Sequence, residues 1–440
     1  MEAMLSEFDY FTPTVIQSAI VAEYDEVIAP TNAINPDTAT GFGTIEFNIT
    51  GASDLYRDLN NSYLMIKVKL VATDGSAVAG TLAAAPVNLP LHSLFATVTA
   101  TLCGKEITSN DTLYPYRAYL ETPLSYDRDV PNTRLHNEGW AKDKQGVMES
   151  LYLATDETKN PKQYHNPGFL ARQKMVLASR ELVLIGRPHL DMFHQPLDLP
   201  PNCGMTLKFT PASRTFSLME ATGGSDKFVL LEAKLYVRTK KVAPELVLAH
   251  REMLNKANMR FPMNRVTVTR HSIAAGFKSI DIPLNFPAKL PKRLFLTFVA
   301  NTACAGALNE NPFNFKNFGV EKLMVHVNGV NMPSDGLTID YANNNCQRAY
   351  LNTLATLGID NENKAIDLSL EEFAGGFAIY GFKIAPGPLD GQVLTAANSV
   401  GNITVSLTFA TAPIVTVDMI VYAETPSFLE IDKVSSVTIV

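Results

Sequence analysis

The sequence predicts an all-β chain organised as two tandem domains. It is 440 residues long, past the size at which single hydrophobic cores usually stop growing. Short segments in which apolar and polar residues alternate recur along its length, separated by loops containing proline and glycine. A six-residue motif also occurs twice, as RAYLET at 117–122 and as RAYLNT at 348–353. Together these observations favour a duplicated β domain.

The expected strands begin with TIEFNIT (44–50), YLMIKVKL (63–70) and FATVTATLCGKEI (95–107). The same alternation returns in later segments: ELVLIG (181–186), MTLKFTP (205–211), FVLLEAKLYVRTK (228–240), RLFLTFVA (293–300), KLMVHVNGV (322–330), ITVSLTFA (403–410) and TVDMIVYAE (416–424). Alternation is typical of strands with one buried face, and many short strands between turns favour sandwiches or barrels.

The best helical segment, ELVLAHREMLNKA (245–257), lies near the middle of the chain, behind Pro244. Its apolar residues recur at helical spacing: Leu246, Ala249, Met253, Leu254 and Ala257. Because strand-rich stretches of similar length flank it, we expect this helix to connect the two domains. The predicted organisation is an arm at 1–27, a first domain at 28–244, the connector at 245–258 and a second domain at 259–440.

The surroundings of the repeated motif also agree between the two halves. Each copy follows an alternating strand that ends in a glycine turn, VTATLCGKEI in the first half and LMVHVNGVNM in the second. Later, MTLKFTPA (205–212) corresponds to ITVSLTFATA (403–412), and KLYVRTKKVAP (234–244) corresponds to IVYAETPSFLEI (420–431). In both copies RAYL is expected to open a short helix with Tyr and Leu pointing inward. Arg117 and Arg348 then face the ring side or solvent, and an ordinary surface charge remains an equally open interpretation.

Composition narrows the classes of function. Charged residues make up 18% and apolar residues 46%, so we expect extensive burial, including against other copies. The net charge of -7 and the absence of a block of Lys and Arg argue against direct binding to nucleic acid. No apolar run approaches the roughly 20 residues that span a bilayer. The cysteines are scattered and no secretory signal is recognised, so we expect free thiols in a reducing compartment: Cys103, Cys203, Cys304 and Cys346.

The strongest metal candidate is RPHLDMFH (187–194), where His189 and Asp191 would share one face of a strand near His194. The spacing matches no recognised ligand set, so hydrogen-bonded structural histidines are the preferred interpretation. Neither a GxSxG elbow, nor HExxH, nor a P-loop is present. The sequence therefore predicts no catalytic, cofactor-binding or metal-binding residues and no cofactor.

Two further features have a functional and an ordinary interpretation. Asp25 with Glu26, and Glu371 with Glu372, are expected on a solvated face rather than as a glycosidase pair. The loop NENPFNFKNFG (309–319) presents three phenylalanines that suit a base or sugar platform, but no basic groove accompanies them. Subunit contact or loop core is therefore the preferred interpretation of that loop.

Several runs are similar to one known family. YLMIKVKL, PVNLPLHSLFATVTATLCGKEIT (86–108) and YPYRAYLETPLSY (114–126) resemble the double jelly-roll major capsid proteins of adintoviruses and Polinton or Maverick elements, a lineage with virophage relatives. LVLIGRPHLDMFHQ (182–195) and IVYAETPSFLEID (420–432) continue the resemblance, as does FVLLEAKLYV leading into the LAHREML helix. The resemblance covers most of the chain in order and is clearest in the first half and at the end.

This resemblance implies two tandem eight-stranded antiparallel jelly rolls joined by a short helical connector, with few helices in loops. It implies a structural protein rather than an enzyme: a major capsid protein whose pseudo-hexagonal homotrimers tile the icosahedral shell of a double-stranded DNA virus or virus-like element. The implied location is the virion, after assembly in the host cytoplasm or nucleus. The expected partners are identical chains, neighbouring capsomers and single jelly-roll penton or minor capsid proteins. A glycan receptor and an inner membrane stay open.

Two alternatives remain beside the capsid hypothesis. A carbohydrate-binding jelly-roll module is disfavoured by the missing secretion signal, and a jelly-roll enzyme by the lack of His-x-His metal ligands. Under the capsid hypothesis, the arm packs against a neighbour or an inner shell protein. The candidate contacts between subunits are aromatic residues of the arm and of the 309–319 loop: Phe8, Tyr10, Phe11, Phe313, Phe315 and Phe318.

Overall fold

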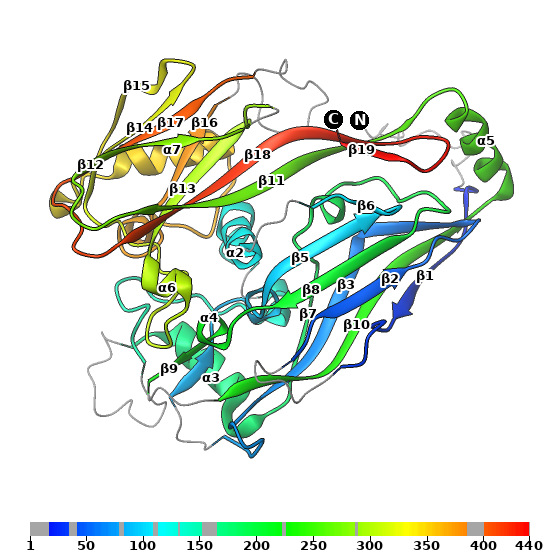
Figure 1. Ribbon diagram of the computed structural model, residues 1–440, viewed down its shortest axis with the longest axis horizontal. Helices are drawn as coiled ribbons and strands as arrows, with labels where there is room; N and C mark the ends of the chain where they lie inside the picture. Colours follow the sequence, from blue (N-terminus) through cyan, green and yellow to red (C-terminus); the bar gives the residue numbers. More distant parts are fainter. Residues whose placement is uncertain are drawn as a thin grey trace, which may run out of the picture.

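The structure is a computed structural model of the chain. It describes residues 17–34, 42–78, 83–108, 113–130, 133–151, 165–221, 226–286, 289–384 and 400–439. These residues form two β barrels, each built from two antiparallel sheets of four main strands (Figure 1).

The first barrel occupies the first half of the chain. One of its sheets contains, in spatial order, β1 (Ile20–Ile28), β10 (Lys227–Val242), β3 (Leu55–Val71) and β7 (Leu182–Gly186). The other contains β2 (Ile45–Ile49), β8 (Met205–Pro211), β5 (Phe95–Leu102) and β6 (Lys105–Glu106). A short pair, β4 (Ala84–Pro86) and β9 (Leu218–Glu220), lies apart from both sheets.

The second barrel repeats this plan. Its first sheet contains β11 (Met259–Ile273), β18 (Val417–Ile431), β13 (Arg293–Ala300) and β16 (Ile379–Lys383), with β19 (Val437–Ile439) paired to β18. Its second sheet contains β12 (Ser279–Leu284), β17 (Ile403–Phe409), β14 (Val320–Val327) and β15 (Val330–Thr338).

Both barrels have jelly-roll topology. When the eight main strands of each half are numbered along the chain, the sheets of both halves read 1-8-3-6 and 2-7-4-5. This interleaving of early and late strands in two facing sheets is that of two nested Greek keys. The predicted fold, two tandem eight-stranded antiparallel jelly rolls, is confirmed.

Sequence alternation produces the barrel cores. In β8 the side chains of Met205, Leu207 and Phe209 are buried and those between them are not, and β17 follows the same rule. These two strands are the MTLKFTPA and ITVSLTFATA segments, and both are the seventh strand of their barrel. The expected correspondence between the two halves is therefore confirmed by their topology.

The repeated RAYL motif lies on two equivalent helices. α2 (Tyr114–Ser125) and α7 (Gln347–Leu357) each connect the fifth strand of a barrel to the sixth. Shorter helices lie in the other loops: α1 (Pro90–Ser93), α3 (Pro167–Val176), α4 (Arg214–Ser217), α6 (Asn301–Ala305) and α8 (Leu370–Ala374). Single 3-10 turns complete the connections: η1 (Arg134–Glu138), η4 (Leu177–Ser179), η5 (Asp191–Phe193) and η6 (Tyr341–Asn343). Among the described residues, no helix combines the length and apolarity needed to span a membrane.

The predicted boundary of the amino-terminal arm needs a correction. Residues 20–27 were assigned to an arm that precedes the first strand, but they form β1, the first strand of the first barrel, paired with β10. β1 is an edge strand whose side chains are mostly exposed on both faces, so it lacks the alternation that marks a half-buried strand. Residues 1–16 lie outside the described residues.

Helix α5 (Pro244–Leu254) lies between the two barrels in sequence, where the connector is expected. Its predicted apolar face does not match its packing. Val247, which is outside the predicted face, is the buried residue and packs with Tyr56 and Val242, whereas Ala249 and Met253 of the predicted face are exposed. A helix that bridges two domains contacts protein over a narrow stripe only, so helical spacing of apolar residues does not identify that stripe.

Candidate functional site

The two barrels meet at a buried junction built around α2. Figure 1 shows this helix between the β11–β18 pair and the strands of the first barrel. Tyr116, Tyr119 and Leu120 of α2 are at most 1% exposed and share one hydrophobic cluster with the core of the second barrel. Phe261 and Leu429, at the far ends of β11 and β18, belong in turn to the core cluster of the first barrel. The junction is therefore continuous with both cores.

An aromatic stack fixes α2 to the second half of the chain. The ring of Tyr119 lies parallel to that of Phe313, with centroids 4.1 Å apart and an interplanar angle of 10°. Tyr116 meets Phe313 edge-on at 5.6 Å, and Phe315 meets Tyr119 edge-on at the same distance. Trp140 packs on the Tyr119 ring at 5.3 Å. Aromatic pairs of this kind contribute about 0.5–1.5 kcal/mol each beyond their buried area.

This stack corrects part of the predicted contact set. Phe313 and Phe315 are fully buried within the chain, so the prediction that they contact a neighbouring subunit is wrong, and they form loop core instead. They are buried because Tyr116 and Tyr119 of α2 pack against them within the chain. Phe318 is partly buried beside a surface pocket, and its contact with a neighbour stays a prediction. Phe8, Tyr10 and Phe11 lie outside the described residues.

Beside the stack, α2 carries a buried ion network. Arg117 donates hydrogen bonds to Glu121 Oε1 at 2.9 Å and to Asp191 Oδ1 at 2.7 Å, and the arginine is only 9% exposed. Its counterpart Arg348 on α7 is an exposed residue that forms an ion pair with Asp335. The two copies of the motif have therefore diverged: the first Arg is structural and buried, and the second is a surface charge.

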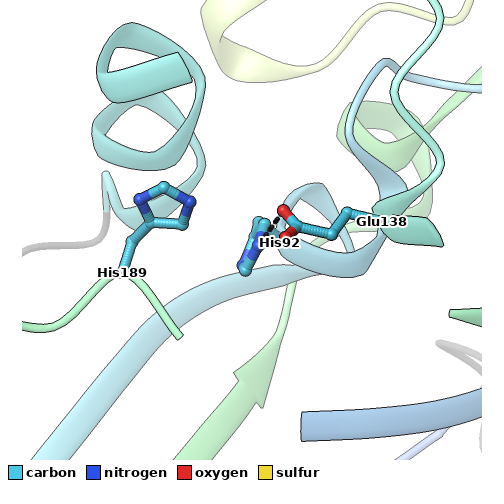
Figure 2. Close-up of side chains that lie close together, drawn as sticks. All are labelled: His92, Glu138 and His189. Atoms are coloured by element: carbon cyan, nitrogen blue, oxygen red, sulfur yellow. Dashed lines mark hydrogen bonds and ion pairs between the residues drawn. The ribbon is translucent and has the colours of Figure 1, made fainter. Parts of the chain in front are cut away.

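Three histidines extend the network from α2. His189 contacts Glu121 through Nδ1, and its ring packs edge-on against that of His92 at 4.6 Å. His92 uses both ring nitrogens, Nδ1 with the Tyr114 hydroxyl at 2.8 Å and Nε2 with Glu138 Oε2 at 3.2 Å. Figure 2 shows His92 between His189 and Glu138. The third histidine, His194, lies 5.6 Å from His189, measured between ring centroids.

The network crosses to the second barrel at two points. The backbone N–H of Val266 in β11 donates to Asp191 Oδ1 at 3.3 Å. The Tyr422 hydroxyl in β18 bonds to Glu121 Oε1 and to Glu424 Oε1, each at 3.2 Å. Polar groups of the first half thus hold two specific strands of the second, which fixes the orientation of one barrel relative to the other.

Burial and charge together set the protonation of this network. Burial alone would raise the pKa of Glu121, but Arg117 and His189 outweigh it and hold that pKa well below its usual value. Burial lowers the pKa of His92 and lowers that of His194 to about 3, although carboxylates oppose both shifts. At neutral pH, Glu121 is therefore charged and both of these histidines are neutral.

Two groups of side chains in the network have donor atoms close enough for a metal: His92, Glu138 and His189, and Glu121, His189 and His194. In the first group both nitrogens of His92 already have hydrogen-bond partners. In the second, Nδ1 of His194 accepts a hydrogen bond from the guanidinium of Arg187 at 3.2 Å, so the ring hydrogen is on Nε2, the atom nearer Glu121. Arg117 adds a second fixed positive charge. These side chains suit a hydrogen-bonded ion network better than a cation site.

Asp191 stands apart from both groups. The sequence placed it with His189 and His194 as a metal candidate, but its carboxylate pairs with Arg117 instead. Each of the two adjacent carboxylate pairs has a member engaged in an ion pair or a helix cap. Asp25 pairs with Arg238 at 3.1 Å, and Glu372 completes the capping box of α8 with Ser369.

A second buried network lies on the other side of the junction. Arg172 of α3 is 0% exposed and donates to Asp143 Oδ1 at 2.8 Å and to the carbonyl oxygens of Pro86 and Ala141. Asn311, in the loop before β14, donates to the other carboxylate oxygen of Asp143 at 2.9 Å. Asp143 thus joins the first half to the second. Arg172, Asp143 and Asn311 could not be identified from the sequence, because no spacing pattern links residues so far apart in the chain.

The structure also brings two of the scattered cysteines together. The sulfur atoms of Cys103 and Cys203 lie 3.0 Å apart, and both residues are free thiols. Cys304 and Cys346 are free and buried.

The buried histidine predicts a loss of stability in mild acid. His92 has a lower pKa in the folded chain than the usual 6.5, so the unfolded chain binds more protons below pH 6.5. Its contribution is complete above pH 6.5 and is lost as the pH falls below that value, by up to about 1.4 kcal/mol per pH unit. We expect urea denaturation to show a lower free energy of unfolding at pH 5.5 than at pH 7.5, and His92→Gln to flatten this dependence. The matched control is His136→Gln on the surface; an equal slope in wild type and His92→Gln would contradict the prediction.

Comparisons with known proteins agree with this architecture. No protein-family model matches the chain. An uncharacterised Caenorhabditis elegans protein, F54H12.2, is 26% identical over 409 residues, which span 89% of this chain and 91% of that protein. A chain in the cryo-EM structure of the Sputnik virophage is 12% identical and superposes with a TM-score of 0.65, covering 100% of this chain and 92% of the other.

The Faustovirus major capsid protein is 9% identical and superposes with a TM-score of 0.56, covering 96% of this chain and 92% of that one. At such identities the likeness concerns the fold. Both barrels and the junction between them lie within the superposed length, since nearly the whole chain is covered in each comparison. The chain thus has the double jelly-roll fold, which it shares with the Faustovirus major capsid protein.

Proposed function

We propose that this protein is a major capsid protein, a structural building block of a virus shell rather than an enzyme. The observation that carries the proposal is the pairing of two barrels of identical topology in one chain. The fold is also that of the Faustovirus major capsid protein, over 96% of this chain. Charged groups at the junction bond to one another and to strands of the second barrel, as Arg117, Glu121 and Asp191 do, which suits an architectural role.

Two fixed, similar barrels favour a three-chain ring. A closed ring of three chains presents six similar barrels, so its outline approximates a hexagon that can tile a curved shell. A single-barrel chain would need six copies for the same footprint. We therefore propose homotrimeric, pseudo-hexagonal capsomers that pack beside one another in an icosahedral shell.

The finer assignments follow from the sequence resemblance. We propose that the source is an adintovirus, a Polinton element or a virophage relative with a double-stranded DNA genome. The protein would reside in the virion after assembly in a reducing host compartment, which agrees with its four free cysteines. Single jelly-roll penton or minor capsid proteins would complete the shell beside its capsomers.

The mass in solution tests the proposal. We expect recombinant protein to elute from size exclusion with a light-scattering mass three times 48.1 kDa and to show a hexagonal outline by negative-stain microscopy. The two readouts are independent, because mass reports the number of chains and the outline reports their arrangement. A monomer that stays monomeric over a wide range of concentrations would overturn the proposed self-assembly.

A further inference from the structure

At the junction within one chain, helix α2 of the first barrel packs against the second barrel. On the outer face of the second barrel, Val268 of β11, Tyr422 of β18 and Phe295 of β13 are direct cross-strand neighbours. All three are at most 3% exposed. Helix α2 of the first barrel packs here, and its Glu121 accepts a hydrogen bond from the Tyr422 hydroxyl. We call these three residues the Tyr422 row.

The first barrel carries the same row in the same register. The segment KLYVRT of β10 corresponds to IVYAET of β18, which makes Tyr236 the counterpart of Tyr422. Tyr236 lies directly opposite Val27 of β1 on one side and Tyr63 of β3 on the other. We call these three residues the Tyr236 row. Within the described residues the two flanking positions of this row are exposed, Val27 by 53% and Tyr63 by 39%, while Tyr236 is partly buried.

The second barrel carries an equally open helix. α7 is the counterpart of α2, and it lies along β16 with Thr353 bonded to the backbone of that strand. The motif aligns Leu351 with Leu120 of α2. Leu120 is 0% exposed in the junction, whereas Leu351 is 54% exposed. One helix and one row are thus joined within the chain, while among the described residues Leu351 of the equivalent helix and two residues of the equivalent row, Val27 and Tyr63, are exposed.

We propose that α7 of one chain packs on the Tyr236 row of a second copy of this chain. This inference rests on the proposed function and names the contact that would build the capsomer. Around a ring of three chains, six barrel-to-barrel contacts of one kind would alternate, three within chains through α2 and three between chains through α7. Two copies of one helix motif and two copies of one row would then all be buried.

The charged residues near the proposed contact are already paired within each chain. β1, at the edge of the Tyr236 row, carries Glu23 and Asp25, whose side chains are 43% and 47% exposed. Arg348, one turn from Leu351 on α7, is a half-exposed cation. Arg238 offsets one of the two β1 carboxylates and Asp335 offsets Arg348, so the proposed contact joins a weakly acidic edge to a neutral ion pair. Recognition in the proposed contact therefore depends mainly on its apolar residues.

A charge placed on α7 tests the contact. We expect Leu351→Asp to shift the mass in solution from three times 48.1 kDa to 48.1 kDa, with an unchanged circular dichroism spectrum. The matched control is Leu248→Asp on α5, which alters an equally exposed leucine (58% against 54%) outside the proposed contact and should remain trimeric. A wild-type monomer would refute the proposed function itself. A trimeric wild type together with a trimeric Leu351→Asp would refute only this contact.

Cross-linking gives a test that does not depend on loss of assembly. A chain with both Val27→Cys and Leu351→Cys, treated with a short bismaleimide, should form covalent dimers and trimers on a denaturing gel. Each single variant and the wild type, which retains the native cysteines, serve as controls and should stay monomeric on that gel. Equal cross-linking of the double variant and the single variants would overturn the proposal.

Residues 1–16 are the competing occupant of the row, because they directly precede β1 in the sequence. Deleting them should leave the trimer intact if α7 covers the row. Loss of the trimer on deletion, together with its survival in Leu351→Asp, would assign the row to that segment instead.

Discussion

The Phe313→Ala variant is expected to unfold with a free energy about 3–5 kcal/mol lower than the wild type, the usual cost of removing a fully buried phenylalanine. Phe313 is 0% exposed and stacks on Tyr119 of α2, so its loss leaves a cavity between the two halves. Because the ring contacts residues from both halves, the cavity should also weaken the coupling between the barrels. Urea denaturation followed by circular dichroism measures the loss, and a broadened or biphasic transition would report the weakened coupling.

Phe318→Ala is the matched control for this prediction. Phe318 belongs to the same loop and is the same residue type, but it is only partly buried. Its replacement should cost much less, because it removes less buried surface. Equal losses for the two variants would contradict the assignment of Phe313 to the junction core.

The Arg172→Met variant should lose about 3–5 kcal/mol, because it leaves the Asp143 carboxylate buried without its cation. Both side chains are 0% exposed, and methionine fills a similar volume without a donor. The free energy of unfolding at pH 7 measures the effect. Pairing the change with Asp143→Leu should restore part of the loss, since an apolar pair no longer buries a lone charge.

Arg260→Met provides the comparison at the surface. Arg260 pairs with Glu430 at 2.7 Å, a shorter distance than that between Arg172 and Asp143, but its side chain is 70% exposed. Exposed ion pairs contribute about 0–1 kcal/mol, so this variant should stay close to the wild type. A loss below about 1 kcal/mol for Arg172→Met would show that the buried network does not hold the junction.

The barrel cores could be predicted from sequence because the burial of each core strand is visible in a short, continuous segment. A strand such as β8 or β17 buries one face, so apolar and polar residues alternate at consecutive positions of its sequence. β1 escaped prediction because both of its faces are exposed and its place depends on the partner strand β10. The duplicated segments were recognised because the seventh and eighth strands of both barrels kept similar residues while their loops changed.

The junction could not be predicted, because its information is distributed along the chain. Asn311 is 168 residues from its partner Asp143, and Tyr422 is 301 residues from Glu121. The motif itself was also ambiguous: identical RAYL sequences put Arg117 in a buried network and Arg348 at the surface. Which Arg is buried depends on whether a second barrel of the same chain packs against its helix. A local sequence pattern does not show whether such a barrel is present.

The shared core also imposes an order on folding during synthesis. Leu429 and Ile431 of β18 belong to the core cluster of the first barrel, as do Phe261 and Met263 of β11. A ribosome translates β18 only after every other main strand of both barrels. The core of the first barrel therefore lacks its β18 residues until the second barrel has been synthesised. Completion of both barrels then coincides in time, and a nascent chain cannot offer a finished first barrel to other copies before its second barrel exists.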